Sequence, residues 1–385
     1  MMWMKKTIKE LDIYISDGNY SSKYPRSEEF VEEGIPFIRG NNMVDGDITD
    51  DEMYFITPEK HSILLKGHVK AGDVLITTRG NIGQVAIVPD RHEDSNINAQ
   101  IVLLRTNQET LYNRYLLWAL QSHEANEQYL ALQTGTALKQ LPVGKLEKLS
   151  IEVTDINKQH EIADILDKTY EVVKLRRKEL QLLDDLIKAR FVELFDGKYP
   201  EDTLLNLCSI IDYRGKTPEK VERGLPFITA KNVKMHHMTL EPREYISKET
   251  YDKVMVRGFP KEGDVVFTTE APLGNVCRIP HFDTEFYIGQ RIVTMQTDAL
   301  NPTYLEYALS DEEFVRKYMG KSSGSTVTGI RVRLLEQLTI PVPPRTLQDE
   351  FSIFVEQVDK SKVAVQKALT ETQLLFDSLM QQYFG

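Results

Sequence analysis

The chain has 385 residues, of which 41% are hydrophobic and 27% charged, and its formal net charge is −11. This composition is typical of a globular protein and excludes the disordered class, while the acidic balance argues against wrapping nucleic acid by bulk charge. No apolar run approaches ~18 residues and the start lacks a signal-peptide pattern, so we expect a cytoplasmic protein. Cys208 and Cys277 stand alone without a CxxC spacing, which argues against a disulfide framework and a structural zinc site.

The first part of the chain has the pattern of short strands separated by turns. Runs rich in β-branched residues occur at 35–38, 74–77, 84–88 and 101–104. The segment 78–83 between the second and third runs contains two glycines and an asparagine, which suit a tight loop. The sequence therefore predicts a hairpin with a polar tip. A helical pattern follows at 113–130.

A long helix is predicted next, because apolar residues recur at a spacing of seven without an intervening proline or glycine. Its predicted seam consists of Leu166, Val173, Leu180, Leu183, Ile187 and Leu194. At ~1.5 Å per residue, a helix over 159–195 would be roughly 55 Å long. The alternative, an amphipathic helix lying on its own domain, is disfavoured because such helices are usually nearer 10 to 15 residues.

The second half of the chain repeats these features at an offset of about 190 residues. The sequence at 35–38 recurs at 225–228, and Gly72-Asp73-Val74 recurs as Gly263-Asp264-Val265. A second hairpin with a different tip is predicted at 265–279, and a second helical pattern at 302–318. The second seam consists of Val355, Val358, Val365, Leu369, Phe376 and Leu379. Copies of this length are the size of a domain with an appended element.

We therefore predict an α+β chain in which two pseudo-twofold-related mixed α/β domains are separated by a long antiparallel two-helix coiled coil. The expected boundaries are 1–157 for the first domain, 158–196 for the first helix, 197–346 for the second domain and 347–385 for the second helix. Arg176, Arg190 and Lys362 fall on the inward side of the seam, which indicates that each helix is paired and that its register is fixed. An antiparallel second helix would return Gly385 to the first domain.

Motifs for catalysis and metal binding are missing from the sequence. It has neither an Asn/Asp-Pro-Pro-aromatic motif nor a G-x-G-x-x-G fingerprint. Gly215-Lys216-Thr217 resembles the end of a phosphate-binding loop, but Ile210 stands where the first glycine belongs, so a polar turn is favoured. The eight histidines show no ligand spacing, and the adjacent His236 and His237 indicate a surface turn. Neither a catalytic residue nor a metal ligand is predicted, and Cys277 is expected to pack as a small hydrophobe.

The motifs, occurring twice in the same order, resemble the specificity subunit of type I restriction-modification systems over the full length. The most specific stretches are the glycine-serine loop and the segment that leads into each long helix. They run from Gly324-Ser325-Thr326 through Leu335, Leu338 and Ile340-Pro341-Val342-Pro343-Pro344 to Gln348, with counterparts at Gly135-Thr136, Leu146, Leu149, Ile151 and Gln159. In the first copy Val153-Thr154-Asp155 replaces the proline cluster, which bears on the stiffness of that joint.

The resemblance implies a non-catalytic, sequence-specific DNA-binding subunit whose two domains are target-recognition domains, each reading one half of an asymmetric bipartite site. It also implies that the subunit holds two methyltransferase subunits and, in the full complex, two translocating endonuclease subunits. S-adenosylmethionine, ATP and magnesium are then expected on those partners, with no cofactor on this chain. Independently, two differing domains in a duplicated chain suit double-stranded DNA with half-sites about one helical turn apart.

Polar loops at matching places in the two copies are the predicted DNA contacts. Arg, Asn and Gln can make bidentate contacts with bases, while hydroxyls and glycine-loop amides suit phosphates. The predicted residues are Arg39, Asn41 and Asn42 with Thr229, Lys231 and Asn232 after the first strand; Thr78, Arg79, Asn81 and Gln84 with Thr269 and Glu270 at the hairpin tips; and Thr134, Thr136, Lys139 and Gln140 with Lys321, Ser322, Ser323, Ser325, Thr326 and Arg331 in the glycine loops.

Alternatives remain for the role of the loops as DNA contacts and for the function of the whole chain. The loops could be ordinary solvated turns, and Gln100 and Gln290, flanked by apolar strand residues, are expected to be hydrogen-bonded in the core rather than to read bases. The alternative for the chain is a protein-interaction scaffold with two heads on a coiled-coil rod and no DNA role. A nuclease with an unrecognised site is a more remote third.

Overall fold

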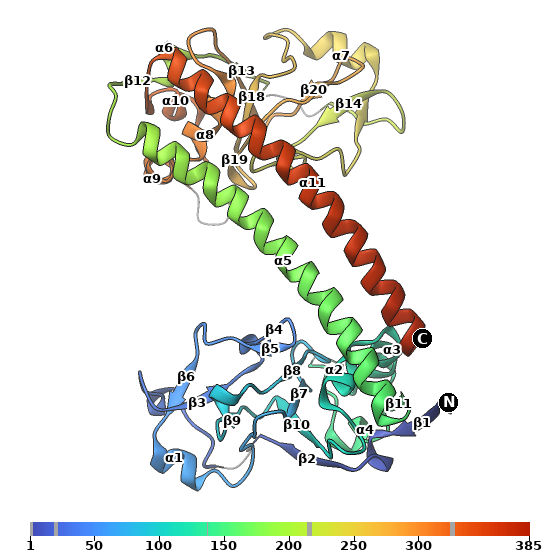
Figure 1. Cartoon of the computed structure of the whole chain (residues 1–385). Coiled ribbons are helices and arrows are strands. Elements are labelled where there is room, and N and C mark those ends of the chain that lie inside the picture. Colours follow the sequence, from blue (N-terminus) through green and yellow to red (C-terminus); the bar gives the residue numbers. More distant parts are fainter. Residues whose placement is uncertain (1–2, 19–21, 137, 214–217, 324–327) are drawn as a thin grey trace. The chain divides into compact units, whose positions relative to one another are not determined.

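The computed structural model describes residues 3–18, 22–136, 138–213, 218–323 and 328–385. Contacts divide the chain into two units, each of which contains a segment of both long helices (Figure 1). Unit 1 comprises Met1–Arg177 and Lys367–Gly385, and unit 2 comprises Lys178–Gln366. In the described residues, no helix combines the length and the apolar character that crossing a membrane requires.

Unit 1 is built on a four-stranded antiparallel sheet in the order β2–β10–β7–β8. Its strands are β1 (Met4–Thr7), β2 (Ile13–Asp17), β3 (Ile35–Ile38), β4 (Met43–Val44), β5 (Asp47–Ile48), β6 (Tyr54–Ile56), β7 (Val74–Thr77), β8 (Val85–Ile87), β9 (Asn96–Ile97), β10 (Ile101–Thr106) and β11 (Ser150–Val153), and its short helices are α1 (Pro58–Ile63), α2 (Asn113–Gln121), α3 (His123–Leu132) and α4 (Val143–Leu146). The predicted hairpin is confirmed, since β7 pairs with β8 in the register Val74 to Ile87.

Both faces of the unit 1 sheet are buried, which explains the continuous apolar run in β7. Ile76 packs with Tyr115 and Trp118 of α2, whereas Leu75 points into a second cluster with Ile38 and Met43. Successive side chains of a strand point to opposite faces, so a strand covered on both sides has no polar alternation. The apolar runs at 74–77 and 101–104 are therefore strands of this covered sheet.

Unit 2 repeats this arrangement, with a sheet in the order β13–β21–β18–β19. Its strands are β12 (Glu201–Thr203), β13 (Ser209–Asp212), β14 (Leu225–Ile228), β15 (Val233–Lys234), β16 (His237–Met238), β17 (Tyr245–Ile246), β18 (Val265–Thr269), β19 (Leu273–Arg278), β20 (Tyr287–Ile288), β21 (Ile292–Gln296) and β22 (Thr339–Pro341), and its short helices are α6 (Leu204–Leu207), α7 (Lys248–Val254), α8 (Pro302–Ser310), α9 (Glu312–Met319) and α10 (Val332–Leu335). The sequence repeat is thus a repeat of strand order.

Each of the two helical patterns predicted at 113–130 and 302–318 is broken into two helices. Ser122 has an extended backbone and its hydroxyl accepts a hydrogen bond from the Ala125 N–H (3.1 Å), so it ends α2 and caps α3. Asp311 does the same between α8 and α9, accepting from the Glu313 N–H (2.9 Å). The prediction of single helices was wrong because the apolar spacing continues across a good N-cap residue.

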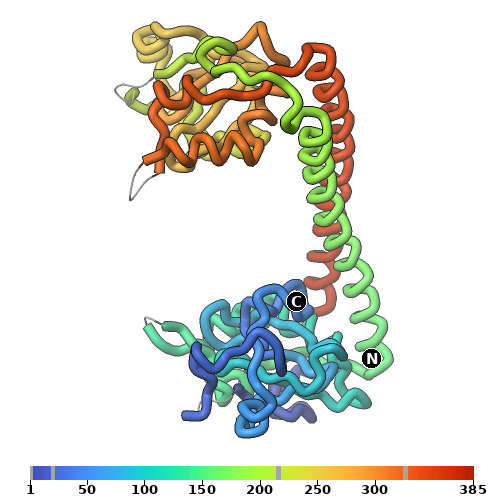
Figure 2. The backbone as a smooth tube through the Cα atoms, turned by 90° about the vertical axis from the view of Figure 1, so that its left-hand side faces the viewer, coloured from blue at the N-terminus to red at the C-terminus, as the bar shows by residue number. Residues whose placement is uncertain are grey.

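The long helices are α5 (Ile156–Phe195) and α11 (Arg345–Phe384), whose ends lie within two residues of the predicted ones. In unit 1, Trp118 packs edge-on against both Tyr170 of α5 and Phe376 of α11. In unit 2, Phe191 of α5 packs against Phe351 of α11. The two helical segments run side by side in each unit (Figure 2).

The helices pair in antiparallel register in each unit. In unit 2, two of the cations predicted to face inward form ion pairs between the helices that fit this register. Lys362 pairs with Asp184 (2.6 Å), and Arg190 pairs with Glu350 (3.0 Å). All twelve predicted seam residues are buried or half-buried. The paired-helix prediction is therefore confirmed over the solitary amphipathic helix.

The carboxyl end of α11 belongs to unit 1, as the antiparallel prediction requires. The Phe384 ring lies 5.2 Å from the Tyr115 ring of α2. Glu124 at the start of α3 forms an ion pair with Lys5 of β1 and also lies beside Gly385. Lys5 and Gly385, the one early and the other last in the sequence, are therefore close to the same residue.

Candidate nucleic-acid interface

A buried glutamine ties the start of each long helix to the start of an earlier helix of the same unit, α5 to α2 and α11 to α8. The Gln159 amide accepts from the Tyr112 N–H (2.9 Å) and donates to the Thr154 carbonyl (2.8 Å). Gln348 repeats this geometry, accepting from the Asn301 N–H (2.8 Å) and donating to the Pro343 carbonyl (2.8 Å). We call these hydrogen bonds of Gln159 and Gln348 the amide clamp, and the segment that leads into each long helix the joint. The first joint lacks the proline cluster, yet the amide clamp is present at both joints.

Three loops converge in unit 1 at the end of the β7–β8 hairpin. The Thr78 N–H donates to the Gln100 carbonyl (2.7 Å), and the Leu141 N–H donates to the Thr78 carbonyl (2.8 Å). Thr134 and Gln140 exchange backbone hydrogen bonds of 2.8 and 2.9 Å, which closes the glycine loop. We call this meeting of the hairpin tip, the loop before β10 and the glycine loop the loop junction of unit 1.

Unit 2 contains the same loop junction at the end of the β18–β19 hairpin. The Thr269 N–H donates to the Arg291 carbonyl (2.9 Å), and the Ile330 N–H donates to the Thr269 carbonyl (3.0 Å). Ser323 and Gly329 exchange backbone hydrogen bonds of 3.0 and 3.1 Å. These backbone hydrogen bonds are therefore shared by the described parts of both loop junctions, whereas the side chains that they present differ between the units.

Glycine at the hairpin tip allows the loop junction to form. Gly83 has φ +87°, and a Cβ at this position would lie 2.7 Å from the Tyr129 ring of α3. Gly274 has φ +92° and is seated on Tyr318 of α9 in the same way. Both the left-handed backbone and the close approach favour glycine. The tip is therefore held against the helix rather than projecting freely.

The side chains at the two loop junctions differ in charge at matched positions. In unit 1, Arg79 and Gln100 are both exposed. In unit 2 the corresponding positions carry Glu270 and Arg291, which form an ion pair of 2.9 Å at the surface. An exposed pair of this kind contributes little stability, about 0 to 1 kcal/mol, so it can open when a ligand offers better partners.

A recess with charged residues in its lining lies beside the loop junction of unit 2. It has a volume of about 250 Å³, and its lining includes Lys220, Lys231, Gln290 and Arg291. One carboxylate, Glu244, faces the recess and pairs with Lys220 at 2.8 Å. Lys220 pairs with Glu244 and Arg291 with Glu270, so among these residues Lys231 contributes one excess positive charge, which suits an anionic ligand such as a phosphate.

Two asparagines predicted as DNA contacts instead stabilise their own loops. Asn42 is fully buried, accepts from the Arg39 N–H (3.0 Å) and donates to the Asp51 carbonyl (2.9 Å). Asn232, equally buried, accepts from the Thr229 N–H (2.9 Å) and donates to two carbonyls. Their amide groups are already used inside the chain, so both predictions are corrected to a structural role.

Thr78, Thr269 and Gln84 are corrected for the same reason. The Thr78 and Thr269 side chains are buried and donate to the carbonyls of Gln100 and Arg291. The Gln84 amide donates to the Met43 carbonyl. At the matching position of unit 2, the Asn275 amide donates to the Val233 carbonyl (2.8 Å). Thr78 and Thr269 thus hold the loop junctions together from the inside, and Gln84 ties the hairpin to β4.

The prediction that Gln100 is hydrogen-bonded in the core was wrong. Its side chain is exposed, and it is the backbone carbonyl of Gln100 that bonds to Thr78. Gln290 is half-buried and lines the unit 2 recess. The loop before β10, whose sequence resembles the flank of a strand, is thus part of the surface.

Arg39, which was predicted as a DNA contact, stacks over the Tyr54 ring at 3.4 Å and donates to the Glu52 carbonyl (2.6 Å).

The remaining predicted residues lie on the surface of the loops. The exposed ones are Asn41, Arg79, Asn81, Thr134, Thr136, Lys139, Lys231, Lys321, Ser323 and Arg331, and the half-buried ones are Gln140, Thr229, Glu270 and Ser322. Ser325 and Thr326 lie outside the described residues, as do Gly215-Lys216-Thr217. The surface set supplies the side chains that a ligand could reach.

The cysteines have no nucleophilic character in the folded chain. Burial raises the pKa of the Cys277 thiol to about 12, and it raises the pKa of the Cys208 thiol to about 12 as well. Both thiols therefore remain protonated at neutral pH. Cys277 is fully buried in β19, which confirms that it packs as a small hydrophobe.

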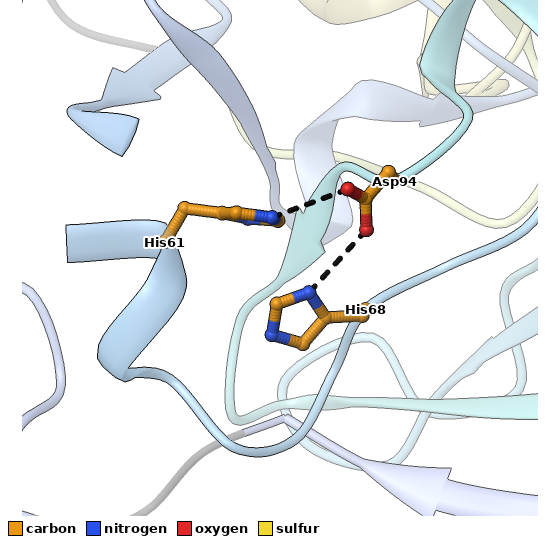
Figure 3. A group of neighbouring side chains, drawn as sticks. All are labelled: His61, His68 and Asp94. Carbon is orange, nitrogen blue, oxygen red and sulfur yellow. Dashed lines mark hydrogen bonds and ion pairs between the residues drawn. The ribbon is translucent and has the colours of Figure 1, made fainter. Parts of the chain in front are cut away.

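A histidine group was missed by inspection of sequence spacing. His61, His68 and Asp94 lie together in unit 1, where both rings point toward the carboxylate (Figure 3). Only the tertiary fold brings them together, because His61 lies in the last turn of α1, His68 follows in the next loop, and Asp94 precedes β9. By contrast, His236 lies in the β15–β16 turn, as predicted, whereas His237 is the first residue of β16 and pairs with Lys234.

Comparison with known proteins agrees with this architecture. The family model described as type I restriction modification DNA specificity domain matches residues 2–184 and 206–373. Two proteins of Methanocaldococcus jannaschii are similar in sequence: the putative type I restriction enzyme MjaX specificity subunit is 23% identical over 87% of this chain and 84% of its own length, and the type I restriction enzyme MjaVIII specificity subunit is 22% identical over 91% and 84%.

Solved structures show the same fold. The S subunit of a type I restriction-modification system from M. genitalium superimposes with a TM-score of 0.59 at 17% identity, covering 100% of this chain and 96% of that one. A chain from a study of type I system assembly and conformational transition gives a TM-score of 0.57 at 18% identity, covering 99% and 97%. The chain belongs to the type I restriction-modification DNA specificity family and is the non-catalytic DNA specificity subunit of such a system.

Proposed function

We propose that units 1 and 2 are the two target-recognition domains, that each reads one half of an asymmetric bipartite DNA site, and that the loop junctions make the contacts. One observation carries this proposal: a shared backbone framework presents Arg79 and Gln100 in unit 1 but Glu270 and Arg291 in unit 2. A constant framework with variable polar side chains is what reading two different short sequences requires. A pure scaffold would not need this arrangement.

The chemistry of these side chains suits base edges. Arginine can bond to guanine O6 and N7, glutamine to adenine N6 and N7, and a carboxylate can accept from cytosine N4. Each good bidentate pair discriminates against the wrong base by ~1 to 3 kcal/mol. The cations of the unit 2 recess, Lys231 and Arg291 among them, suit the backbone phosphates that set the register of the protein on the duplex.

The long helices are the proposed attachment surface for the partner subunits. In unit 2, Leu182 and Leu186 of α5 and Ile353 and Val363 of α11 have 47 to 71% of their surface exposed. Exposed aliphatic side chains in this number mark a protein interaction site. Two methyltransferase and two endonuclease subunits complete the complex, and S-adenosylmethionine, ATP and magnesium bind to those partners.

The test changes one loop junction at a time in the complex with its methyltransferase. We expect Arg79→Ala with Gln100→Ala to alter the methylated motif in one half-site only, and Glu270→Ala with Arg291→Ala to alter the other half only. The measurement is methylation sequencing, with DNase footprinting at fixed salt. Lys9→Ala, an exposed cation outside the junction, should leave the motif unchanged. The proposal is overturned if both double variants keep the wild-type motif and footprint.

A further inference from the structure

His61, His68 and Asp94 of unit 1 form a cluster of ligand-type side chains outside the loop junction. The His61 Nε2 atom lies 3.3 Å from Asp94 Oδ2, and the His68 Nδ1 atom lies 3.4 Å from Asp94 Oδ1 (Figure 3). One ligand atom from each residue lies within 4.8 Å of the others, and the ring centroids are 4.4 Å apart. The backbone fixes this arrangement, because Asp94 donates to the Val69 carbonyl (2.9 Å).

The other nitrogen of each ring is held by a hydrogen-bond acceptor. His61 Nδ1 lies 2.6 Å from Oδ1 of Asn96, a fully buried residue, and His68 Nε2 bonds to the Leu64 carbonyl. Because each of these partners accepts, Nδ1 of His61 and Nε2 of His68 carry hydrogens, and neutral rings direct lone pairs at the carboxylate. This is the outer-shell arrangement that orients histidines for a metal ion.

The atoms are also close to coordination distance. Zinc bonds to histidine nitrogen at ~2.0 to 2.1 Å and to carboxylate oxygen at ~2.0 to 2.2 Å, so tetrahedral ligand atoms lie about 3.4 Å apart. Each histidine nitrogen lies at about this spacing from one Asp94 oxygen, 3.3 Å to Oδ2 for His61 and 3.4 Å to Oδ1 for His68, so the carboxylate must turn slightly to offer one oxygen to an ion shared by both rings. We propose that His61, His68 and Asp94 bind one divalent ion of the zinc class, with water as the fourth ligand. The ion joins α1, the loop after it and the turn before β9.

Unit 2 does not offer this site. The matching positions, counted from the duplicated strands and glycines, carry Tyr251, Phe259 and Glu285. Tyr251 is buried in an aromatic and aliphatic cluster, and Glu285 pairs with Lys248. Two imidazoles are replaced by rings without a nitrogen ligand, so the proposed stoichiometry is one ion per chain.

The test uses the full chain without a polyhistidine tag, stripped with a chelator, dialysed and titrated with zinc or cobalt in the absence of DNA. We expect one equivalent of bound zinc by elemental analysis, and a visible cobalt spectrum of tetrahedral type. His68→Gln and Asp94→Asn should each weaken zinc binding at least tenfold. Asp94 has φ 59°, a conformation that asparagine also adopts readily, so Asp94→Asn keeps the turn.

The matched control is His281→Gln. His281 lies 2.7 Å from Glu262 and 3.4 Å from Asp283, but it is the single histidine of that group and its side chain is 70% exposed. This variant should retain one equivalent of zinc. The proposal is overturned if the wild-type chain binds no zinc at micromolar concentration, or if Asp94→Asn and His68→Gln keep wild-type affinity. DNA is absent throughout, so the outcome is independent of the DNA-reading proposal.

Discussion

Replacing the clamp glutamine of one joint should destabilise one unit and spare the other. In Gln159→Leu the Tyr112 N–H and the Thr154 carbonyl lose their side-chain partners, both of which lie within 2.9 Å in the wild type. Each buried backbone group left unpaired costs about 1 to 3 kcal/mol, so the two together cost about 2 to 6 kcal/mol. Since 1 kcal/mol shifts Tm by about 2 to 4 °C for 150 to 250 residues, a loss of at least about 4 °C follows.

Differential scanning calorimetry with limited proteolysis measures this effect and assigns it to a unit. Gln159→Leu should expose unit 1 to cleavage at lower temperature, and Gln348→Leu should do the same for unit 2. The control is Gln181→Leu, on the exposed face of α5, where the glutamine bonds only to Asp185 (3.0 Å). If Gln159→Leu and Gln181→Leu melt at the same temperature, the amide clamp does not stabilise the joint.

Three further predictions concern the whole chain. The purified chain alone should transfer no label from S-adenosylmethionine to DNA, and transfer by the chain without a methyltransferase would contradict the non-catalytic assignment. Joining Gly385 to the start by a short linker and opening the chain at 196–198 should preserve folding, because Lys5 and Gly385 both lie near Glu124; a permutant that is insoluble even with its partners would contradict this. Inserting one heptad after Leu180 and one after Leu369 adds roughly 10 Å of helix. At ~3.4 Å per base pair this is about three base pairs. Methylation sequencing should then show the same half-sites with a longer gap, and an active variant with the original gap would show that the helices do not set the spacing.

The sequence alone predicts the repeated architecture, because its signals are local and occur twice. β3 and β7 begin and end where the apolar runs do, and the seam residues from Leu166 to Leu379 are all buried or half-buried. Hydrophobic periodicity reports which faces are covered, so it predicts strands and long paired helices well. Hydrophobic periodicity missed the helix break at Ser122, since a capping side chain ends a helix without interrupting the apolar spacing.

The composition of the binding surface was decided by tertiary structure. A polar residue in a loop can point outward to a ligand or inward to a backbone group, and sequence does not distinguish Asn42, which is buried and fully bonded, from Asn41, which is exposed. Gln100 is exposed because its carbonyl, rather than its side chain, bonds to Thr78. His61, His68 and Asp94 converge only because the backbone after α1 lies against the turn before β9. Sequence determined the elements and their duplication, whereas contacts between distant loops determined which side chains meet.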